Sequence, residues 1–316
     1  MDVTSLGRTD AWAGVRAVVV GFDADGQAAA DNLLYLGATV EVLDPVASPH
    51  TREFSDLLSV LGASFHLSSD ELGDDPAVDL VITTAVSADA GVDAVVARHP
   101  AATVMSALDL ARHFEPEQAW ILVGAASDED GAAQRIAQGA VTLLRAGGVN
   151  AALGGTGGRP ALELVMEPER YDALVVVVTP EVLARSAALR PQSACVLVDV
   201  PGLAAAYTDV ERACVYKPAV AATEDMVAQA DVIEGARAIG ITLGTPAPGM
   251  LGVVEDVVCD RAFVADRRNS AAELCTLDAL SDSSEEAVEN LLASVALARA
   301  YGVALPEIRA VISETF

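Results

Sequence analysis

The chain is poor in lysine, histidine, cysteine and aromatic residues. Its 316 residues contain a single lysine (Lys217), four histidines and four cysteines, and aromatic side chains make up only 4%. Acidic residues outnumber basic ones and leave a net charge of −27. Such a charge repels nucleic-acid phosphates and anionic membrane surfaces. We therefore expect no nucleic-acid partner and no membrane insertion.

The few cysteines carry no sign of a metal site or a disulfide framework. They are far apart in the sequence, without CxxC spacing or neighbouring histidines, and we expect reduced thiols in the core. The N-terminal stretch MDVTSLGRTD carries acid instead of a basic leader, and no apolar run approaches the length of a membrane span. These features predict a cytoplasmic protein. The cysteines are Cys195, Cys214, Cys259 and Cys275.

What the sequence does have is a large share of small and branched apolar residues. Hydrophobic residues make up 52% of the chain, which with so few aromatics favours α/β layers built from Ala, Val and Leu. Apolar runs typical of strands alternate with helical patterns, so we expect parallel sheets flanked by helices. The length suits two domains. We place their boundary at Pro116, which gives domains 1–116 and 117–316.

The stretch 16–44 predicts a Rossmann-like unit: strand, glycine turn, helix and a second strand ending in Asp44. Gly21 and Gly26 form GxxxxG where a dinucleotide fingerprint has GxGxxG, and Asp44 stands where an acidic residue would meet a ribose hydroxyl. These residues are compatible with an NAD(P)-dependent oxidoreductase. They are equally compatible with an ordinary turn between a strand and a helix, without any ligand. The first domain continues with predicted strands over 79–84 and 103–105 and helices over 54–61, 89–98 and 108–114.

The second domain opens with a strand over 120–124, a small-residue loop, a helix over 131–145 and a glycine-rich turn over 154–159. This is the layout of a mononucleotide-binding unit. Its loop normally reads GxxxxGK[ST], because the lysine neutralises phosphates and the hydroxyl holds Mg²⁺. Here the lysine is missing, and three carboxylates stand where the polyphosphate would lie. They either hold a cation or cap the next helix. The loop runs Gly124, Ala125, Ala126, Ser127, Asp128, Glu129, Asp130 and Gly131.

The rest of the second domain also alternates. Apolar runs predict strands over 171–178, 194–200, 213–216, 238–243 and 252–263. The segment 251–264 has hairpin character. Pro180 begins a helix, and helical patterns follow over 285–301 and 306–313.

Several segments together resemble the Mur ligase family, in particular its D-glutamate-adding branch. They include VVVGFDADGQAAADNLLYLGATVEVLD, LLRAGGVNAALGGTGGRPALEL, ERACVYKPAVAATEDMVAQADVIEGARAIGITLG and LGVVEDVVCDRAFVADRRNSAAEL, and the resemblance covers nearly the whole chain. It implies a first domain that binds a UDP-muramoyl precursor and a P-loop-NTPase-like central domain that binds ATP and Mg²⁺. A third, amino-acid-binding domain is expected to be absent. The precursor contacts that the resemblance implies are Gly21, Phe22, Gly26, Asp44, Thr156 and Arg159.

The departures from the family fall on its chemistry. The family needs one lysine in the phosphate loop and a second, carbamylated one beside the metal, and Lys217 matches neither. The family's metal-binding glutamate aligns with Val177, and its His-Asn pair aligns with Glu286 and Ala287. Of the family residues in the next helical turn, only Asn290 is retained. We therefore expect a catalytically degenerate pseudo-ligase with no catalytic residue, metal or cofactor. It would bind a UDP-sugar precursor or a protein of cell-wall synthesis or division. The alternative is a working ATP- and Mg²⁺-dependent ligase completed by a partner.

Overall fold

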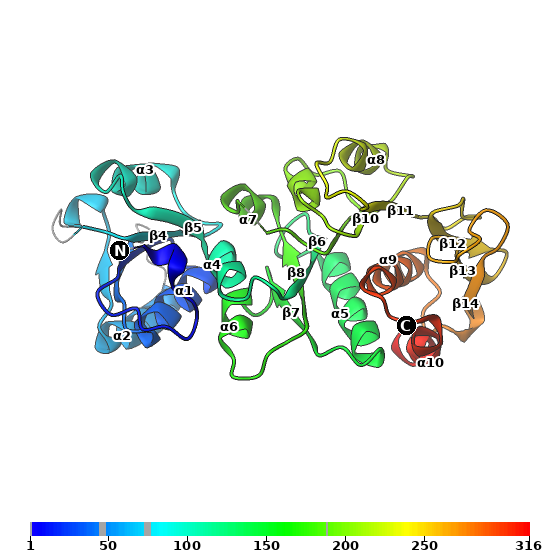
Figure 1. The fold of residues 1–316 in the computed structure, drawn as a ribbon, viewed down its shortest axis with the longest axis horizontal. Coiled ribbons are helices and arrows are strands. Elements are labelled where there is room, and N and C mark those ends of the chain that lie inside the picture. Colours follow the sequence, from blue (N-terminus) through cyan, green and yellow to red (C-terminus); the bar gives the residue numbers. More distant parts are fainter. Residues whose placement is uncertain (1, 44–48, 73–76, 188) are drawn as a thin grey trace. The chain divides into compact units, whose positions relative to one another are not determined.

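The computed structural model describes residues 2–43, 49–72, 77–187 and 189–316 (Figure 1). The chain forms two compact units. Unit 1 is Met1–Glu117 with Arg159–Glu169 and Ala184–Ala188, and unit 2 is Gln118–Gly158 with Arg170–Leu183 and Leu189–Phe316. Each unit is built around a mainly parallel sheet with flanking helices, which confirms the expected α/β class.

Unit 1 holds a fully parallel sheet in the strand order β3-β2-β1-β4-β5. All residues of β1 are buried, as expected for the centre of a parallel sheet. Because β1 lies between β2 and β4, the connections on its two sides run in opposite directions, and this creates a switch point at its carboxyl end. The strands are β1 (Arg16–Val20), β2 (Thr39–Leu43), β3 (Ser64–His66), β4 (Leu80–Thr83) and β5 (Thr103–Ser106).

The helices of unit 1 include one that comes from beyond residue 117. Helix α6 packs against α1 and α4. This segment therefore belongs to unit 1, although the preceding segment Gln118–Gly158 belongs to unit 2. The helices are α1 (Ala24–Tyr35), α2 (Pro49–Leu61), α3 (Asp89–Arg98), α4 (Ala107–Phe114) and α6 (Ala161–Met166), with 3₁₀ turns η1 (Val3–Ser5) and η2 (Ser69–Glu71).

Unit 2 holds a larger sheet in the order β14-β13-β12-β11-β10-β9-β6-β8-β7. Strands β6 to β12 pair in parallel, whereas β13 pairs antiparallel with both β12 and β14, so the predicted hairpin is β12–β13. A second switch point lies at the carboxyl end of β6, between β9 and β8. The strands are β6 (Ala119–Gly124), β7 (Ala151–Gly155), β8 (Ala173–Val178), β9 (Ser193–Val196), β10 (Ala213–Tyr216), β11 (Arg237–Ile241), β12 (Met250–Val254), β13 (Val257–Asp260) and β14 (Ala272–Thr276).

Helices α5 and α9 pack along each other beside this sheet (Figure 1). A Cβ on Gly139 of α5 would lie 2.5 Å from Ser294 Oγ of α9, so only glycine permits this approach. The Ser294 hydroxyl donates to the backbone oxygen of Asn290 at 2.7 Å. The remaining elements are α5 (Gly131–Ala146), α7 (Pro180–Arg185), α8 (Ala221–Ala228), α9 (Glu285–Tyr301), α10 (Leu305–Thr315), η3 (Leu203–Tyr207) and η4 (Leu277–Ala279).

Two local predictions are wrong. The strand expected over 194–200 ends at Val196, because its partner strand β10 ends at the paired residue Tyr216 and offers no ladder beyond it. The glycine-rich turn begins later than expected, because Gly154 and Gly155 belong to the edge strand β7. Strands of Ala and Gly have no side-chain alternation by which to recognise them.

The cysteines are free thiols, as expected. Burial raises the pKa of Cys214 to about 12 and that of Cys275 to about 11, so these thiols stay protonated at neutral pH. None of the helices in the described part of the chain combines the length and the apolar composition needed to cross a bilayer.

Candidate functional site

The loop after β1 brings the predicted residues Gly21, Phe22 and Gly26 together at the first switch point. Gly21 has φ +91°, and a Cβ there would lie 2.6 Å from Thr84 Oγ1. A Cβ on Gly26 would lie 2.3 Å from the Gly21 oxygen. Both glycines are therefore required by the close approach of the loop to α1 and β4. Asp44 lies outside the described residues.

Next to this loop, Phe22 is buried in the core and the Thr84 hydroxyl has no hydrogen-bond partner among the described residues. The Phe22 ring is 3% exposed and packs edge-on against Phe65, with ring centroids 5.1 Å apart. The Thr84 hydroxyl is buried and has no hydrogen-bond partner in the described structure. Buried hydroxyls normally have a partner, so this group favours a ligand at the loop.

The charges at the same loop oppose a diphosphate. Asp23 caps α1 by accepting the Gly26 N–H at 3.0 Å, which uses an amide that would otherwise face an anion. Burial raises the pKa of Asp25 to about 6, and the neighbouring carboxylates Asp23 and Glu163 add to the shift. A diphosphate placed here would meet these negative groups above pH 6.

The second switch point, the phosphate loop, is closed by one of its own carboxylates. Asp130 Oδ2 accepts the N–H of Ala126 at 2.9 Å, and Oδ1 accepts those of Ala132 and Ala133 at 3.1 and 3.2 Å. These are the amides at the start of a helix that a bound phosphate would use. Asp130 therefore takes the place of the anion, as the cap of α5.

The other residues of the phosphate loop differ in burial. Gly124 is the buried end of β6, and Ser127, Asp128 and Glu129 are exposed. The described residues contain no group of three or more His, Cys, Asp or Glu side chains able to hold a metal ion. The interpretation of the three carboxylates as a cation site thus gains no support from their geometry.

Two cations of unit 2, Arg135 on α5 and Lys217 after β10, face carboxylates of α9. Arg135, in the second turn of α5, forms an ion pair with Glu286. Lys217 Nζ lies 2.5 Å from Glu289 Oε1. Arg135 and Lys217 are therefore each paired with a glutamate of unit 2.

The predicted contacts Thr156 and Arg159 do not belong to one unit. The Thr156 oxygen accepts the Gln134 side-chain N–H at 2.6 Å, and its N–H donates to Val177 O at 2.9 Å, both in unit 2. Arg159 belongs to unit 1, where its guanidinium pairs with Glu167 at 2.6 Å and Glu163 at 3.7 Å. Arg159 thus meets carboxylates of its own unit.

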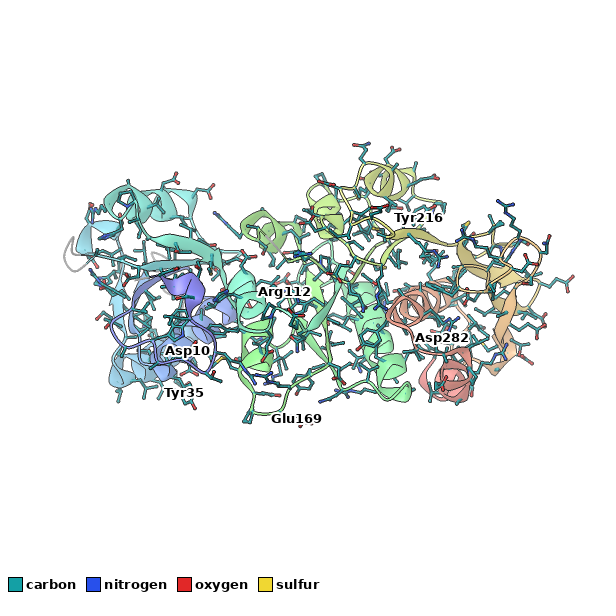
Figure 2. The ribbon with its side chains drawn as sticks, viewed as in Figure 1. Asp10, Tyr35, Arg112, Glu169, Tyr216 and Asp282 are labelled. Atoms are coloured by element: carbon teal, nitrogen blue, oxygen red, sulfur yellow. The ribbon has the colours of Figure 1, made fainter. Side chains whose placement is uncertain are left out.

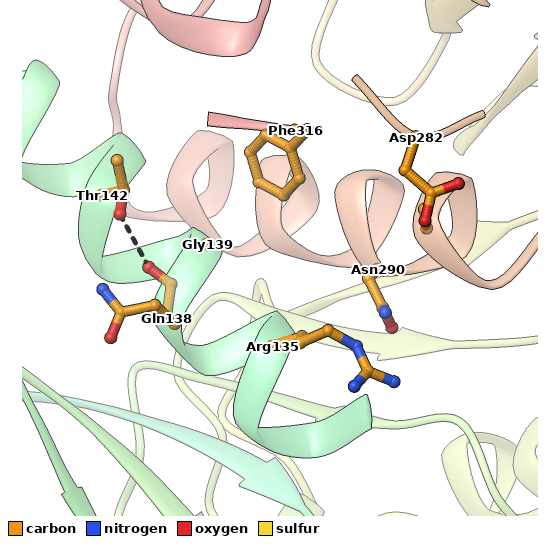
Figure 3. Close-up of a pocket in the computed structure, with 8 residues that line it drawn as sticks. Arg135, Gln138, Gly139, Thr142, Asp282, Asn290 and Phe316 are labelled. Carbon is orange, nitrogen blue, oxygen red and sulfur yellow. Dashed lines mark hydrogen bonds between the residues drawn. The ribbon is translucent and has the colours of Figure 1, made fainter. Parts of the chain in front are cut away.

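A cavity of about 250 Å³ lies between α5 and α9 (Figure 3). Asn290 is only 5% exposed, and Figure 3 shows its amide directed toward the side of Arg135. Sequence reasoning noted Asn290 but missed the cavity, because its walls come from segments 150 residues apart. The lining residues are Arg135, Gln138, Gly139, Thr142, Asp282, Ala287, Asn290 and Phe316.

The chain is similar in sequence to known bacterial ligases. No family model matches the chain. The UDP-N-acetylmuramoylalanine--D-glutamate ligase of Streptomyces avermitilis is 35% identical over 324 residues, covering 94% of this chain and 66% of the relative. The enzyme of the same name from Leifsonia xyli is 34% identical over 340 residues, covering 96% and 64%. The chain belongs to the Mur ligase family. It spans about two thirds of the length of these curated relatives.

Two solved Mur ligase structures share the fold. The murein peptide ligase of Psychrobacter arcticus superposes with a TM-score of 0.57 at 14% identity, covering 95% of this chain and 68% of that chain. The UDP-N-acetylmuramate:L-alanyl-gamma-D-glutamyl-meso-diaminopimelate ligase from Neisseria meningitides has the same TM-score and identity, covering 95% and 98%.

Within the Mur ligase fold, the residues present do not fit Mg·ATP. Val177, in the position that the resemblance gives to a metal-binding glutamate, is 1% exposed in the core of β8. Glu286, in the position of a histidine, is paired with Arg135. Asp130 occupies the loop amides that a nucleotide phosphate would use.

Proposed function

We propose that this Mur ligase relative is a cytoplasmic pseudo-ligase that acts by binding and not by ligation. The observation that carries the proposal is the Asp130 carboxylate on the three amides of the phosphate loop. An acid–amine ligation through an acyl phosphate needs charge neutralisation on the transferred phosphoryl group. Here the loop supplies a negative charge, and Arg135 and Lys217 are neutralised by glutamates.

The loss of one such group commonly lowers a rate by about two to three orders of magnitude. A loop without a lysine, closed by a carboxylate and lacking the metal glutamate, combines several losses. We therefore propose no cofactor, and a role in peptidoglycan synthesis or cell division through a bound UDP-sugar precursor or a protein of that process. The unpartnered Thr84 hydroxyl supports a retained ligand in unit 1.

The direct test measures phosphate release by the pure protein with ATP, D-glutamate and UDP-N-acetylmuramoyl-L-alanine. We expect no release above the reaction without D-glutamate, while the Streptomyces avermitilis relative serves as the active control. D-glutamate-dependent release by this chain would refute the proposal.

A thermal-shift series identifies the retained ligand. UDP-muramoyl precursors should raise the melting temperature, and more so below about pH 6, where the protonated Asp25 no longer opposes their diphosphate. Mg·ATP and NAD should not raise it, because only a ligand that binds the folded state stabilises it. Thr84→Val keeps the side-chain shape and removes the unpartnered hydroxyl. It should reduce the protection by the precursor without lowering the melting temperature of the free protein.

The second candidate is a ligase completed by a partner protein, and the cavity beside Asn290 favours it. A buried amide directed into a cavity can hydrogen-bond a planar polar group of a ligand. This candidate predicts that Mg·ATP binds and that Asn290→Ala weakens it. Calorimetry that detects no heat from Mg·ATP at millimolar concentration would remove it.

A further inference from the structure

A groove lies at the C-terminal end of α1, the opposite end of this helix from the loop after β1. It has a volume of about 520 Å³ and is lined by three segments of unit 1: the N-terminal loop, the end of α1 and the turn after α6. We call it the Tyr35 groove. Tyr35 and Asp10, both labelled in Figure 2, are among its lining residues. Its lining residues are Arg8, Thr9, Asp10, Ala11, Tyr35, Leu36, Met166, Glu167 and Pro168.

Tyr35 is unusual for an aromatic residue in a chain with so few of them. It is the last residue of α1, and 82% of it is exposed. Large aromatic side chains that are exposed beside a groove are typical of binding surfaces. On the neighbouring helix α2, Leu57, Val60 and Leu61 are also more than half exposed, at 53, 85 and 56%. The apolar surface is thus larger than a single ring.

The electrostatics of the groove favour a cation. The last turn of α1 carries no basic residue, so the negative end of the helix dipole is not compensated there. Arg8 is held by Glu115 at 2.9 Å and donates to the Glu167 oxygen at 3.1 Å. Asp10 lines the groove and accepts only the Gly7 N–H, at 2.7 Å, among the described hydrogen bonds. Its charge therefore has no cation opposite.

We propose that the Tyr35 groove binds an arginine-containing segment of a partner protein. The guanidinium would stack on the Tyr35 ring and bond to Asp10, because a planar cation suits both an aromatic face and a carboxylate. A second copy of this chain is a poor occupant, since two molecules of charge −27 repel each other. The groove belongs to unit 1, so its binding of a partner is independent of whether unit 2 binds a nucleotide.

The test is the binding of a fluorescein-labelled oligo-arginine peptide, followed by fluorescence anisotropy at physiological ionic strength. Salt at that level screens the long-range attraction of the acidic surface. Tyr35→Ala should weaken binding about fivefold, and Tyr35→Phe should stay within about twofold, because the ring supplies the contact. Asp10→Asn keeps the acceptor for Gly7 N–H and should weaken binding about threefold.

The matched control is Asp56→Asn, which removes an equally exposed charge from α2 away from the groove lining. Equal weakening by Asp56→Asn and Asp10→Asn, or unchanged binding by Tyr35→Ala, would overturn the proposal. Should Tyr35→Ala unfold, Tyr35→Lys keeps a long side chain in the helix and should abolish binding. Self-association by light scattering that Tyr35→Ala removes would instead assign the groove to a second copy.

Discussion

The closure of the phosphate loop by Asp130 predicts a stability change that can be calculated from its contacts. Asp130 caps α5 through Ala132 and Ala133 and also holds Ala126. Replacing a helix cap by alanine costs about 0.5–2 kcal/mol. The Ala126 amide is exposed and can turn to water, so it adds little. We expect Asp130→Ala to lower the free energy of unfolding by about 1–2 kcal/mol, and Asp130→Ser, which restores a capping oxygen, by less than about 0.5 kcal/mol.

The same variants also change what the loop can bind. With the carboxylate gone, the amides of Ala126, Ala132 and Ala133 face solvent at a helix N-terminus and can receive an anion. Inorganic phosphate should therefore stabilise Asp130→Ser but not the natural chain. A ligand present at ten times its dissociation constant would add about 1.4 kcal/mol.

Urea denaturation, followed by circular dichroism with and without phosphate, measures both effects. Asp128→Ser is the control, because this neighbour is exposed and leaves the three amides bonded to Asp130. The reasoning is refuted if phosphate stabilises the natural chain as much as Asp130→Ser. It is also refuted if Asp130→Ala unfolds at the same urea concentration as the natural chain.

Three further changes test other parts of the structure. The pKa of Asp25 is raised to about 6, so its ionisation destabilises the folded state above that pH and has no effect below about pH 4. In urea titrations, Asp25→Asn should therefore be more stable than the natural chain at pH 8, by at most about 3 kcal/mol, and equally stable at pH 4. Gly155→Ala places a Cβ 2.2 Å from Val177 O and should cost more than about 3 kcal/mol by the same method, whereas Gly148→Ala, with similar φ and open space, should cost about 1 kcal/mol. Lys217→Met should cost no more than about 1 kcal/mol in thermal unfolding, because its ion pair with Glu289 is partly exposed.

Much of the fold could be predicted because its signals are local. The predicted bounds of α3 and α9 match those observed. For α9, the Ser284 cap and Gly302 at φ +123° mark both ends, and such end signals lie within a few residues of the helix. The elements that escaped prediction carry weaker local signals. Strand β7 is mostly Ala and Gly, and α6 is a six-residue helix.

The sequence alone determined the alternation of strands and helices, the two glycine loops and the loss of a phosphate-loop lysine, because these depend on residue type and spacing. Only the tertiary structure decided that Asp130 turns back onto the loop amides, that Arg135 and Lys217 meet α9 glutamates, and that the end of α1 meets the N-terminal loop in a groove. Each of these depends on where a side chain points or on contacts between distant segments. Periodicity and local propensity carry no information about either.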